Sequence, residues 1–383
     1  MLLVVVMHLG LPGPPKMTAV AVVTVPMKMT SDPPGTPARE LLEAARRGDD
    51  DAFRQLVEPH RRELHAHCYR MLGSLHDAED ALQDALLRAW RGLTQFEGRS
   101  SLRSWLYRIA TNVCLDRISQ RPRRALPVDY GPAADPHVGP GEPVIESVWV
   151  EPYPDQRLAL PDGYAGPEAR YEQRESVELA FIVALQTLPG TQRAALILRD
   201  VLGFSAQETA DMLDTTVPSA NGALRRARRT VARTVPDQSQ QANLRALGDD
   251  GLREVVGRYI DAWERGDVDA LLAMLAEDAT FTMPPLPTWY RGRDAIAVFV
   301  TRFALDDRWR LVATRANGQL AFGAYAWDPD AGSFTPLSLD VLTLDGAIAT
   351  DVTSFVAPST RGAGRERYAT EVFGLFGLPP LLD

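Results

Sequence analysis

The sequence predicts a multidomain protein in which two all-α domains are followed by an α+β domain. Apolar residues recur with helical periodicity through residues 39–122 and again through 171–235. A Pro-rich stretch without sustained periodicity, residues 123–170, separates these two helical segments. Residues 249–383 read as helices followed by short strands, which is typical of an α+β domain. A chain of 383 residues has room for three such domains.

The helix predicted over "LRSWLYRIATNVCLDRI" has two distinct faces. The core-facing stripe consists of Leu102, Leu106, Ile109 and Val113. Trp105, Arg108 and Asn112 lie about a quarter turn away and share a second face. Aromatic rings stack on bases, guanidinium groups neutralise phosphates and amides read base edges, so this face indicates nucleic-acid binding. A solvated face with one half-buried Trp is the alternative that the helix alone leaves open.

The helix predicted over "HDAEDALQDALLRAW" is acidic on the side that turns away from its apolar face. The apolar face consists of Ala78, Leu82, Ala85, Leu86 and Ala89. Asp80, Gln83 and Asp84 lie on another face. Such a face requires either a basic partner or water.

The linker and the second helical segment have different characters. Ten prolines in residues 122–167 predict a loop, although Trp149, Tyr153 and Leu158 are more apolar than a free tether needs and are expected to pack on a domain. Residues 171–235 end in a predicted helix-turn-helix. Ser205 and Glu208 form a capping box that opens its first helix, and Pro218 fits the first turn of its second.

The second helix of this motif is basic. The side chains expected to be exposed on it are Asn221, Arg225, Arg226, Arg228 and Arg229. Two packed helices with a solvated basic end are the alternative to a DNA-binding motif. No acidic residue occurs in 216–235, and this disfavours the alternative.

The net charge of −9 is spread unevenly along the chain. Residues 39–124 hold 16 Arg against 13 acidic residues, and 176–235 hold 7 against 5. Residues 125–175 hold 3 Arg against 10 acidic residues, and 249–383 hold 12 against 20. The acidity therefore belongs to the linker and the C-terminal domain, which leaves two basic helical segments that suit DNA.

Residues 249–383, which follow a predicted hinge at 236–248, form the α+β domain. Four strands are expected between residues 309 and 356, with turns at Asn317-Gly318, at 330–332 and at Asp345-Gly346. The domain contains no histidine, and its candidate acids have no visible partner in the sequence; they are Asp261, Asp278 and Asp351. We therefore predict no catalytic site and no enzyme.

The cysteines, the histidines and the N-terminus point to a cytoplasmic protein without a cofactor. Cys68 and Cys114 are the only cysteines, which implies no disulfide framework. "HAHC" offers three ligands at poor helical spacing without a second cluster, so we expect no metal. Residues 1–38 are expected to be a disordered leader, with a true start at a later Met. Their apolar runs are too short and too Pro-interrupted for a membrane span.

The ordered set of motifs resembles a bacterial sigma factor of the extracytoplasmic-function type. "DAEDALQDALLRAW" and "LRSWLYRIATNVCLDRI" are similar to the polymerase-binding and promoter-melting helices of sigma region two, and "LPGTQRAALILRDVLGFSAQETADMLDTTVPSANGALRRAR" is similar to region four. Residues 252–357 resemble a SnoaL-like domain, a cone-shaped barrel wrapped by helices around a cavity. With "WVEPYPDQRL" in the linker and "LPTWYRGRDAI" in the last domain, the order of parts is similar to the sigma-G-like subfamily.

The resemblance implies roles for the candidate residues. Asp80, Gln83 and Asp84 would dock on the basic coiled coil of the β′ subunit of core RNA polymerase, within contacts to both β′ and β. Trp105, Arg108 and Asn112 would hold unstacked bases of the minus-ten element. The residues that align with contacts to the minus-thirty-five element are Asn221, Gly222, Arg225 and Arg226, and Arg228 would meet phosphate. Pro218 and Gly222 depart from the Ala and Ser that are more usual there, which leaves the base preference open.

The resemblance leaves three alternatives open for the whole chain. The SnoaL-like domain tunes sigma activity by contact, or it acts as a fused enzyme or small-molecule sensor with a ligand in its cavity. The third alternative is a two-domain repressor that binds promoter DNA without polymerase. Neither the promoter sequence nor a separate anti-sigma protein follows from the sequence.

Overall fold

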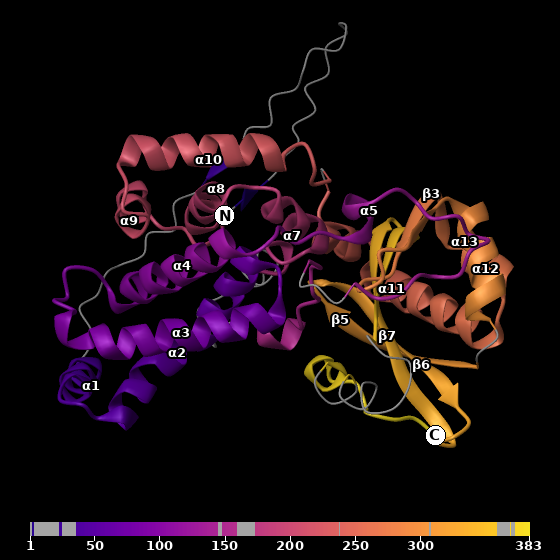
Figure 1. The fold of residues 1–383 in the computed structure, drawn as a ribbon, viewed down its shortest axis with the longest axis horizontal. Helices are drawn as coiled ribbons and strands as arrows, with labels where there is room; N and C mark the ends of the chain where they lie inside the picture. The colour runs from indigo at the N-terminus through magenta and orange to yellow at the C-terminus, as the bar shows by residue number, and fades with distance from the viewer. Residues whose placement is uncertain are drawn as a thin grey trace, which may run out of the picture.

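The computed structural model describes residues 2–3, 23–24, 36–144, 148–158, 173–236, 238–305, 308–357, 368 and 372–383. Figure 1 shows two groups of helices beside a curved sheet that carries its own helices. The predicted fold class, two all-α domains and an α+β domain, is confirmed. The predicted leader lies largely outside the described residues, except for the strand pair β1 (Leu2–Leu3) and β2 (Val23–Thr24) and the start of α1.

The first helical domain is a bundle of four helices. They are α1 (Thr36–Arg46), α2 (Asp50–Leu72), α3 (Leu75–Gly92) and α4 (Leu102–Gln120), with the 3-10 turn η1 (Leu93–Gln95) before α4. The side chains of Asp49, Ser74 and Ser101 accept backbone N–H groups and so begin α2, α3 and α4. Helix α2 ends at Gly73, whose φ of +69° suits glycine.

The linker packs on its neighbours, as the sequence predicts. It contains α5 (Pro127–Tyr130) and the 3-10 turn η2 (Asp155–Arg157). Trp149, Tyr153 and Leu158 are all buried. The linker also runs along the C-terminal domain, where the amide of Ala134 donates to the carbonyl of Trp289. The described part of the linker is therefore not a free tether.

The second helical domain ends in the predicted helix-turn-helix. Its helices are α7 (Leu179–Gln186), α8 (Gly190–Leu196) with the π-helical turn η3 (Ile197–Val201), α9 (Ala206–Met212) and α10 (Val217–Val231). The capping box of Ser205 and Glu208 is present, and Pro218 lies in the first turn of α10. Ala220 and Leu224 face inward, as expected for the buried side of α10.

The C-terminal domain packs helices on a six-stranded sheet. Its helices are α11 (Gln240–Arg265), α12 (Val268–Ala273) and α13 (Arg293–Phe299), with the π-helical turn η4 (Val300–Ala304) and the 3-10 turn η5 (Phe373–Phe376). Its strands are β3 (Leu275–Thr282), β4 (Trp289–Arg291), β5 (Trp309–Ala316), β6 (Gln319–Asp328), β7 (Ser333–Asp345) and β8 (Ile348–Val356). The strand order is β4-β3-β8-β7-β6-β5, in which only the β3–β8 pair is parallel. The four strands predicted after residue 309 and their turns are confirmed.

The predicted hinge at 236–248 differs from the structure. Helix α11 already begins at Gln240 and bends at Gly248, where φ is +65° and ψ is 179°. The segment before the bend is tied to the sheet, because the side chain of Gln240 bonds both the amide and the carbonyl of Leu344. The side chain of Asn243 bonds Gly346 in the same way.

Two large hydrophobic cores follow from this arrangement of the described residues, beside a small cluster between α1, α2 and η1. One lies between α11, α12, α13 and one face of the sheet. The other is continuous from the helical domains through the linker to the opposite face of the sheet, where Tyr368, Phe373 and Phe376 also pack. The helical domains and the C-terminal domain therefore share buried apolar surface. Among the helices of the described ranges, none combines the length and apolarity needed to cross a membrane.

Candidate functional site

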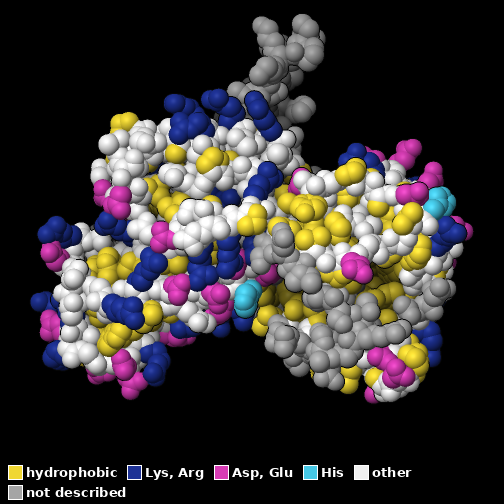
Figure 2. Space-filling view, in the orientation of Figure 1, with side chains coloured by type: hydrophobic (Ala, Val, Ile, Leu, Met, Phe, Trp, Pro, Cys, Tyr) yellow, Lys and Arg dark blue, Asp and Glu magenta, His cyan; other side chains and the backbone are white. Residues whose placement is uncertain are grey.

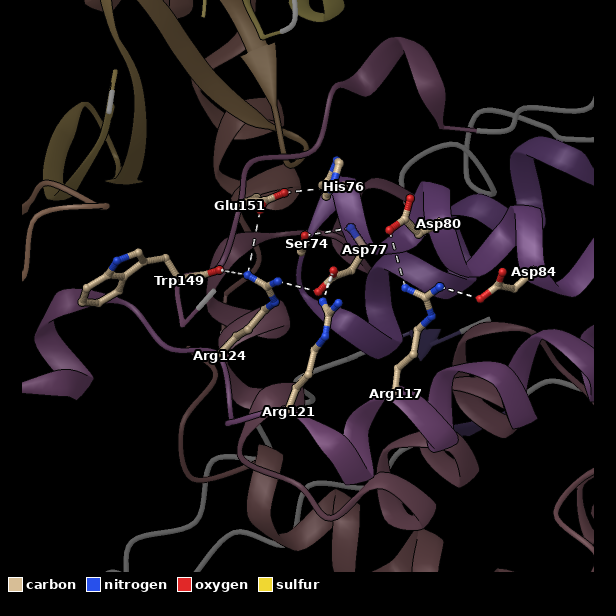
Figure 3. Close-up of polar contacts among 10 residues, drawn as sticks. All are labelled: Ser74, His76, Asp77, Asp80, Asp84, Arg117, Arg121, Arg124, Trp149 and Glu151. Atoms are coloured by element: carbon tan, nitrogen blue, oxygen red, sulfur yellow. Dashed lines mark hydrogen bonds and ion pairs between the residues drawn. The ribbon is translucent and has the colours of Figure 1, made fainter. Parts of the chain in front are cut away.

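The acidic face of α3 is accessible but already carries ion pairs. Gln83 and Asp84 are exposed and Asp80 is partly exposed. Figure 3 shows Arg117 of α4 between the two carboxylates, with Nη2 2.5 Å from Asp84 Oδ2 and Nη1 3.7 Å from Asp80 Oδ2. The predicted docking residues are thus brought together, and a cation of the same chain lies beside them.

The three predicted DNA-binding residues of α4 do not share one open face. The Trp105 ring is partly buried and packs on Phe96, with ring centroids 5.0 Å apart. Arg108 is exposed, and its Nη2 lies 2.6 Å from Oδ1 of Asp214 in the turn between α9 and α10. Asn112 is partly exposed. Their DNA contacts remain predictions, and in this conformation Arg108 is engaged by the second helical domain.

Helix α4 packs on α2 and α3 of its own domain and also on α8 and α9 of the second helical domain. Ser104 Oγ donates to Glu208 at 3.3 Å. The guanidinium of Arg103 lies over the rings of Tyr107 and Phe204, 4.8 and 4.9 Å from their centroids.

The close approach of α8 to α4 leaves little room for a side chain at Gly190. A Cβ added to Gly190 would lie only 3.0 Å from Leu115 Cδ2. The single core-facing stripe predicted for α4 was therefore incomplete, because a second stripe of α4 packs on the helix-turn-helix domain.

The basic face of α10 is open to solvent. Asn221, Arg225 and Arg226 are exposed, and Gly222 is partly exposed. Figure 2 shows dark-blue side chains along the edge of the molecule over α10. Such a face presents donors at helical spacing to a major groove.

Arg228 is placed differently from the other basic residues of α10. Its Nε and Nη2 donate to the two carboxylate oxygens of Asp200 at 2.8 and 2.6 Å. These hydrogen bonds to Asp200 raise the pKa of Arg228 and hold α10 against the end of η3. The phosphate contact of Arg228 stays a prediction, and in the structure the same guanidinium is paired with Asp200.

The "HAHC" histidines turn to separate protein partners. His65 Nδ1 lies 2.9 Å from the hydroxyl of Tyr153, and His67 Nε2 lies 2.9 Å from Thr111 Oγ1. Burial lowers the pKa of His65 to about 4 and that of His67 to about 3, so both rings are neutral at pH 7. Their positions tie α2 to the linker and to α4.

Sequence reasoning identified Asn317 only as a turn residue, but the structure places it at a junction of three domains. Its Oδ1 accepts the amide of Tyr153 at 2.8 Å. Its Nδ2 donates to the Tyr69 hydroxyl at 2.8 Å and to the Val177 carbonyl at 2.7 Å. The side chain is fully buried, and its φ of +55° is one that Asn tolerates. We call this set of contacts the Asn317 junction.

A buried carboxylate lies beside the Asn317 junction. Glu178, just before α7, accepts the amide of Gln241 in the first turn of α11 at 3.0 Å. Burial raises the pKa of Glu178 to about 7, and the nearby Glu175 acts in the same direction. The contact links the second helical domain directly to the first helix of the C-terminal domain.

Three parts of the chain match known families in the order that the structure shows. Residues 56–124 match Sigma-70 region 2, and residues 178–231 match Sigma-70, region 4. Residues 256–354 match the SnoaL-like domain. We therefore refer to the first helical domain as region two and to the second as region four.

Named relatives agree with these matches. The ECF RNA polymerase sigma factor SigG of Mycobacterium tuberculosis is 41% identical over 344 residues, which cover 88% of this chain and 86% of the relative. SigM of the same organism is 34% identical over 208 residues, 54% of this chain and 88% of the relative. The solved structure of M. tuberculosis SigJ covers 77% of this chain and 93% of its own, at 23% identity and a TM-score of 0.47.

The chain belongs to the ECF sigma factors of RNA polymerase, and it carries a C-terminal SnoaL-like domain. Proteins of this class direct promoter-dependent transcription initiation with core RNA polymerase. The resemblance seen in the sequence is thereby confirmed.

Proposed function

We propose that this chain is a promoter-specific sigma factor whose C-terminal domain holds regions two and four in a closed arrangement until polymerase binds. The observation that carries the proposal is the Asn317 junction. One buried side chain of the C-terminal domain bonds region two at Tyr69, the linker at Tyr153 and the segment before region four at Val177. A single turn of the C-terminal domain is thus hydrogen-bonded to region two, to the linker and to the segment before region four.

Within this proposal the candidate residues keep their predicted roles. The α3 face of Asp80, Gln83 and Asp84 docks on core polymerase. The exposed α10 residues that read the minus-thirty-five element in the major groove are Asn221, Gly222, Arg225 and Arg226. Trp105, Arg108 and Asn112 hold minus-ten bases once region four has moved from α4.

The closed arrangement opposes promoter melting because region four occupies part of α4. Arg108 pairs with Asp214, and Ser104 bonds Glu208 in the capping box of α9. These contacts are polar and partly exposed, so each contributes little net stability. Polymerase that draws regions two and four apart therefore breaks these weak polar contacts, but it must also separate the apolar packing of α4 on α8 and α9 and open the buried Asn317 junction.

We assign the C-terminal domain a regulatory role by contact and no catalytic role. The face of its sheet that lies opposite its own helices is taken up by the shared core. The candidate acids Asp261 and Asp351 engage neighbours of the same domain, Arg265 and Thr280 respectively.

Because the proposed partners are core polymerase and promoter DNA, we infer that the protein acts in the cytoplasm.

Run-off transcription with core polymerase tests this function. Full-length protein and protein truncated at residue 238 are compared on a cognate promoter at limiting core polymerase. We expect both to initiate at the same start site and the truncated chain to reach half-maximal output at lower sigma concentration. Equal output of both chains at every concentration would contradict regulation by the C-terminal domain.

A further inference from the structure

The linker leaves region two, runs along the C-terminal domain and returns to region two. Figure 1 shows this part of the chain, in purple, running from α5 toward α13. Residues 131–144 make the contacts with the C-terminal domain, and we call them the linker arm. The arm contains four prolines, which fix φ and so reduce the conformational entropy that the arm loses when it docks.

The chain on either side of the linker arm is fixed to region two. Before the arm, the backbone of Ala125 forms a β-bridge with Trp149, which follows the arm. Figure 3 shows Arg124 bonded to the Trp149 carbonyl, 2.6 Å away, and paired with Asp77 of α3. The side chains of Arg124 and Asp77 are only 7% and 6% exposed. The linker arm is therefore a loop that projects from region two toward the C-terminal domain.

The linker arm is bonded to the segment around β4. The amide of Ala134 donates to the Trp289 carbonyl at 2.8 Å, and Nε1 of Trp289 donates to the Gly131 carbonyl at 2.9 Å. At the other end of the arm, the amide of Val144 donates to the Pro285 carbonyl at 3.0 Å. Ala134 also packs on the core between the helices of the C-terminal domain and the sheet. The arm is thus held by hydrogen bonds at both of its ends.

The linker arm and the Asn317 junction are attached at opposite edges of the sheet. The edge strands of the order β4-β3-β8-β7-β6-β5 are β4 and β5, and Asn317 lies in the turn between β5 and β6. At a spacing of about 4.8 Å per strand, the two edges are about 24 Å apart along the sheet. Contacts more than about 10 Å apart contribute additively to stability when they share no partner. The junction can therefore open while the arm stays bound.

We propose that the linker arm keeps the C-terminal domain on region two after the Asn317 junction has opened. This inference rests on the proposed function, in which polymerase binding opens the junction. A retained domain stays within reach of its former contacts, so closing is an intramolecular step at a high effective concentration. Without the arm, the chain between α10 and α11 alone would tether the domain. The arm therefore makes opening reversible, and the closed arrangement reforms when polymerase leaves.

Hydrogen–deuterium exchange of the full-length protein separates the two attachments. In Asn317→Ala, the Tyr153 amide loses its acceptor and is expected to exchange at least about tenfold faster. The amides of Ala134 and Val144 in the linker arm are expected to stay within about twofold of wild type. Equal acceleration at all three amides would overturn the proposal, because it would show that both edges of the sheet are released together.

Thr288→Val tests the linker arm from the side of the C-terminal domain. The hydroxyl of Thr288 accepts the Gly141 amide at 3.2 Å, and valine has the shape of threonine without this acceptor. We expect the Ala134 amide to exchange about three- to tenfold faster, with the Tyr153 amide unchanged. An unchanged Ala134 amide would overturn the arm as one docked unit. Thr335→Val is the matched control, because the buried Thr335 hydroxyl has no hydrogen-bond partner in the part of the chain that the structure describes.

The same amides in the holoenzyme distinguish this proposal from the proposed function. With core polymerase bound, we expect the Tyr153 amide to lose its protection and the Ala134 amide to keep it. Loss of protection at both amides would overturn retention by the linker arm. Protection kept at both amides in a holoenzyme that initiates transcription would instead contradict the opening of the junction, and with it the proposed function.

A replacement of residues 131–144 by Gly and Ser at equal length tests the consequence for transcription. We expect this chain to reach half-maximal run-off output at about fivefold lower sigma concentration than wild type, because the closed arrangement has lost the contribution of the arm. An unchanged concentration would overturn the proposal. Circular dichroism melting verifies the fold of each variant, and the exchange rates of Asn317→Ala decide the question if the replaced chain does not fold.

Discussion

Removing the side chain of Asn317 is expected to open the junction between the C-terminal domain and the helical domains. The Asn317→Ala change leaves the Tyr153 amide and the Val177 carbonyl without partners in a fully buried site. An unsatisfied buried polar group costs about 1–3 kcal/mol, so the two together weaken the junction by about 2–6 kcal/mol. Because about 1.4 kcal/mol corresponds to a factor of ten, the open population rises at least about tenfold.

Hydrogen–deuterium exchange at the Tyr153 amide measures this opening directly. The amide is bonded to Asn317 Oδ1 and is expected to exchange at least about tenfold faster in the variant, while the α2 and α3 amides stay protected. Asn317→Gly removes the same hydrogen bonds without backbone strain at φ +55°, so it separates the two effects. Asp330→Ala, in the exposed β6–β7 turn of the same domain, is the control. Unchanged exchange at Tyr153 in both Asn317 variants would refute the reasoning.

Three further changes test individual contacts. Asp214→Asn frees Arg108 and is expected to change the free energy of unfolding by less than about 1 kcal/mol, because this ion pair is exposed. Promoter opening by the holoenzyme is expected to become faster, and a slower opening rate would count against the closed arrangement. The pKa of Glu178 is raised to about 7, so Glu178 stabilises the junction below about pH 4.5 and this contribution is lost as the pH rises through 7. The hydrogen-exchange rate of the Gln241 amide, corrected for the intrinsic pH dependence of exchange, is therefore expected to increase between pH 5 and 8 in wild type but not in Glu178→Gln. Equal pH slopes in the two proteins would contradict this. Arg225→Ala is expected to lose about 1–3 kcal/mol of discrimination between wild-type and substituted minus-thirty-five elements in holoenzyme binding assays. An equal loss of binding affinity on both DNAs would assign Arg225 to a phosphate contact instead.

The sequence was sufficient for the elements and for their order because each carries its own local signals. Ser205 and Glu208 are three residues apart, as a capping box requires, and the structure shows both of its hydrogen bonds. The turns of the C-terminal sheet follow from residues such as Asn317 and Gly346 that adopt positive φ. Such signals lie within a few residues of the feature they determine.

The contacts between domains could not be predicted because their partners are far apart in the sequence. Arg108 and Asp214 are 106 positions apart, and Tyr153 and Asn317 are 164 apart. No periodicity marks such pairs, since an exposed Arg and a turn Asp are ordinary in isolation. The second packing stripe of α4 escaped prediction for the same reason, as its partner Gly190 lies in another domain.

Promoter melting tests the central claim most directly. Permanganate oxidation of thymines in the minus-ten region is followed with this protein, with core polymerase and with both together. The account predicts reactive thymines only in the mixture, and weaker reactivity when Trp105, Arg108 and Asn112 are replaced by alanine together. Saturating core polymerase that yields no reactive thymines on any bound promoter would contradict it.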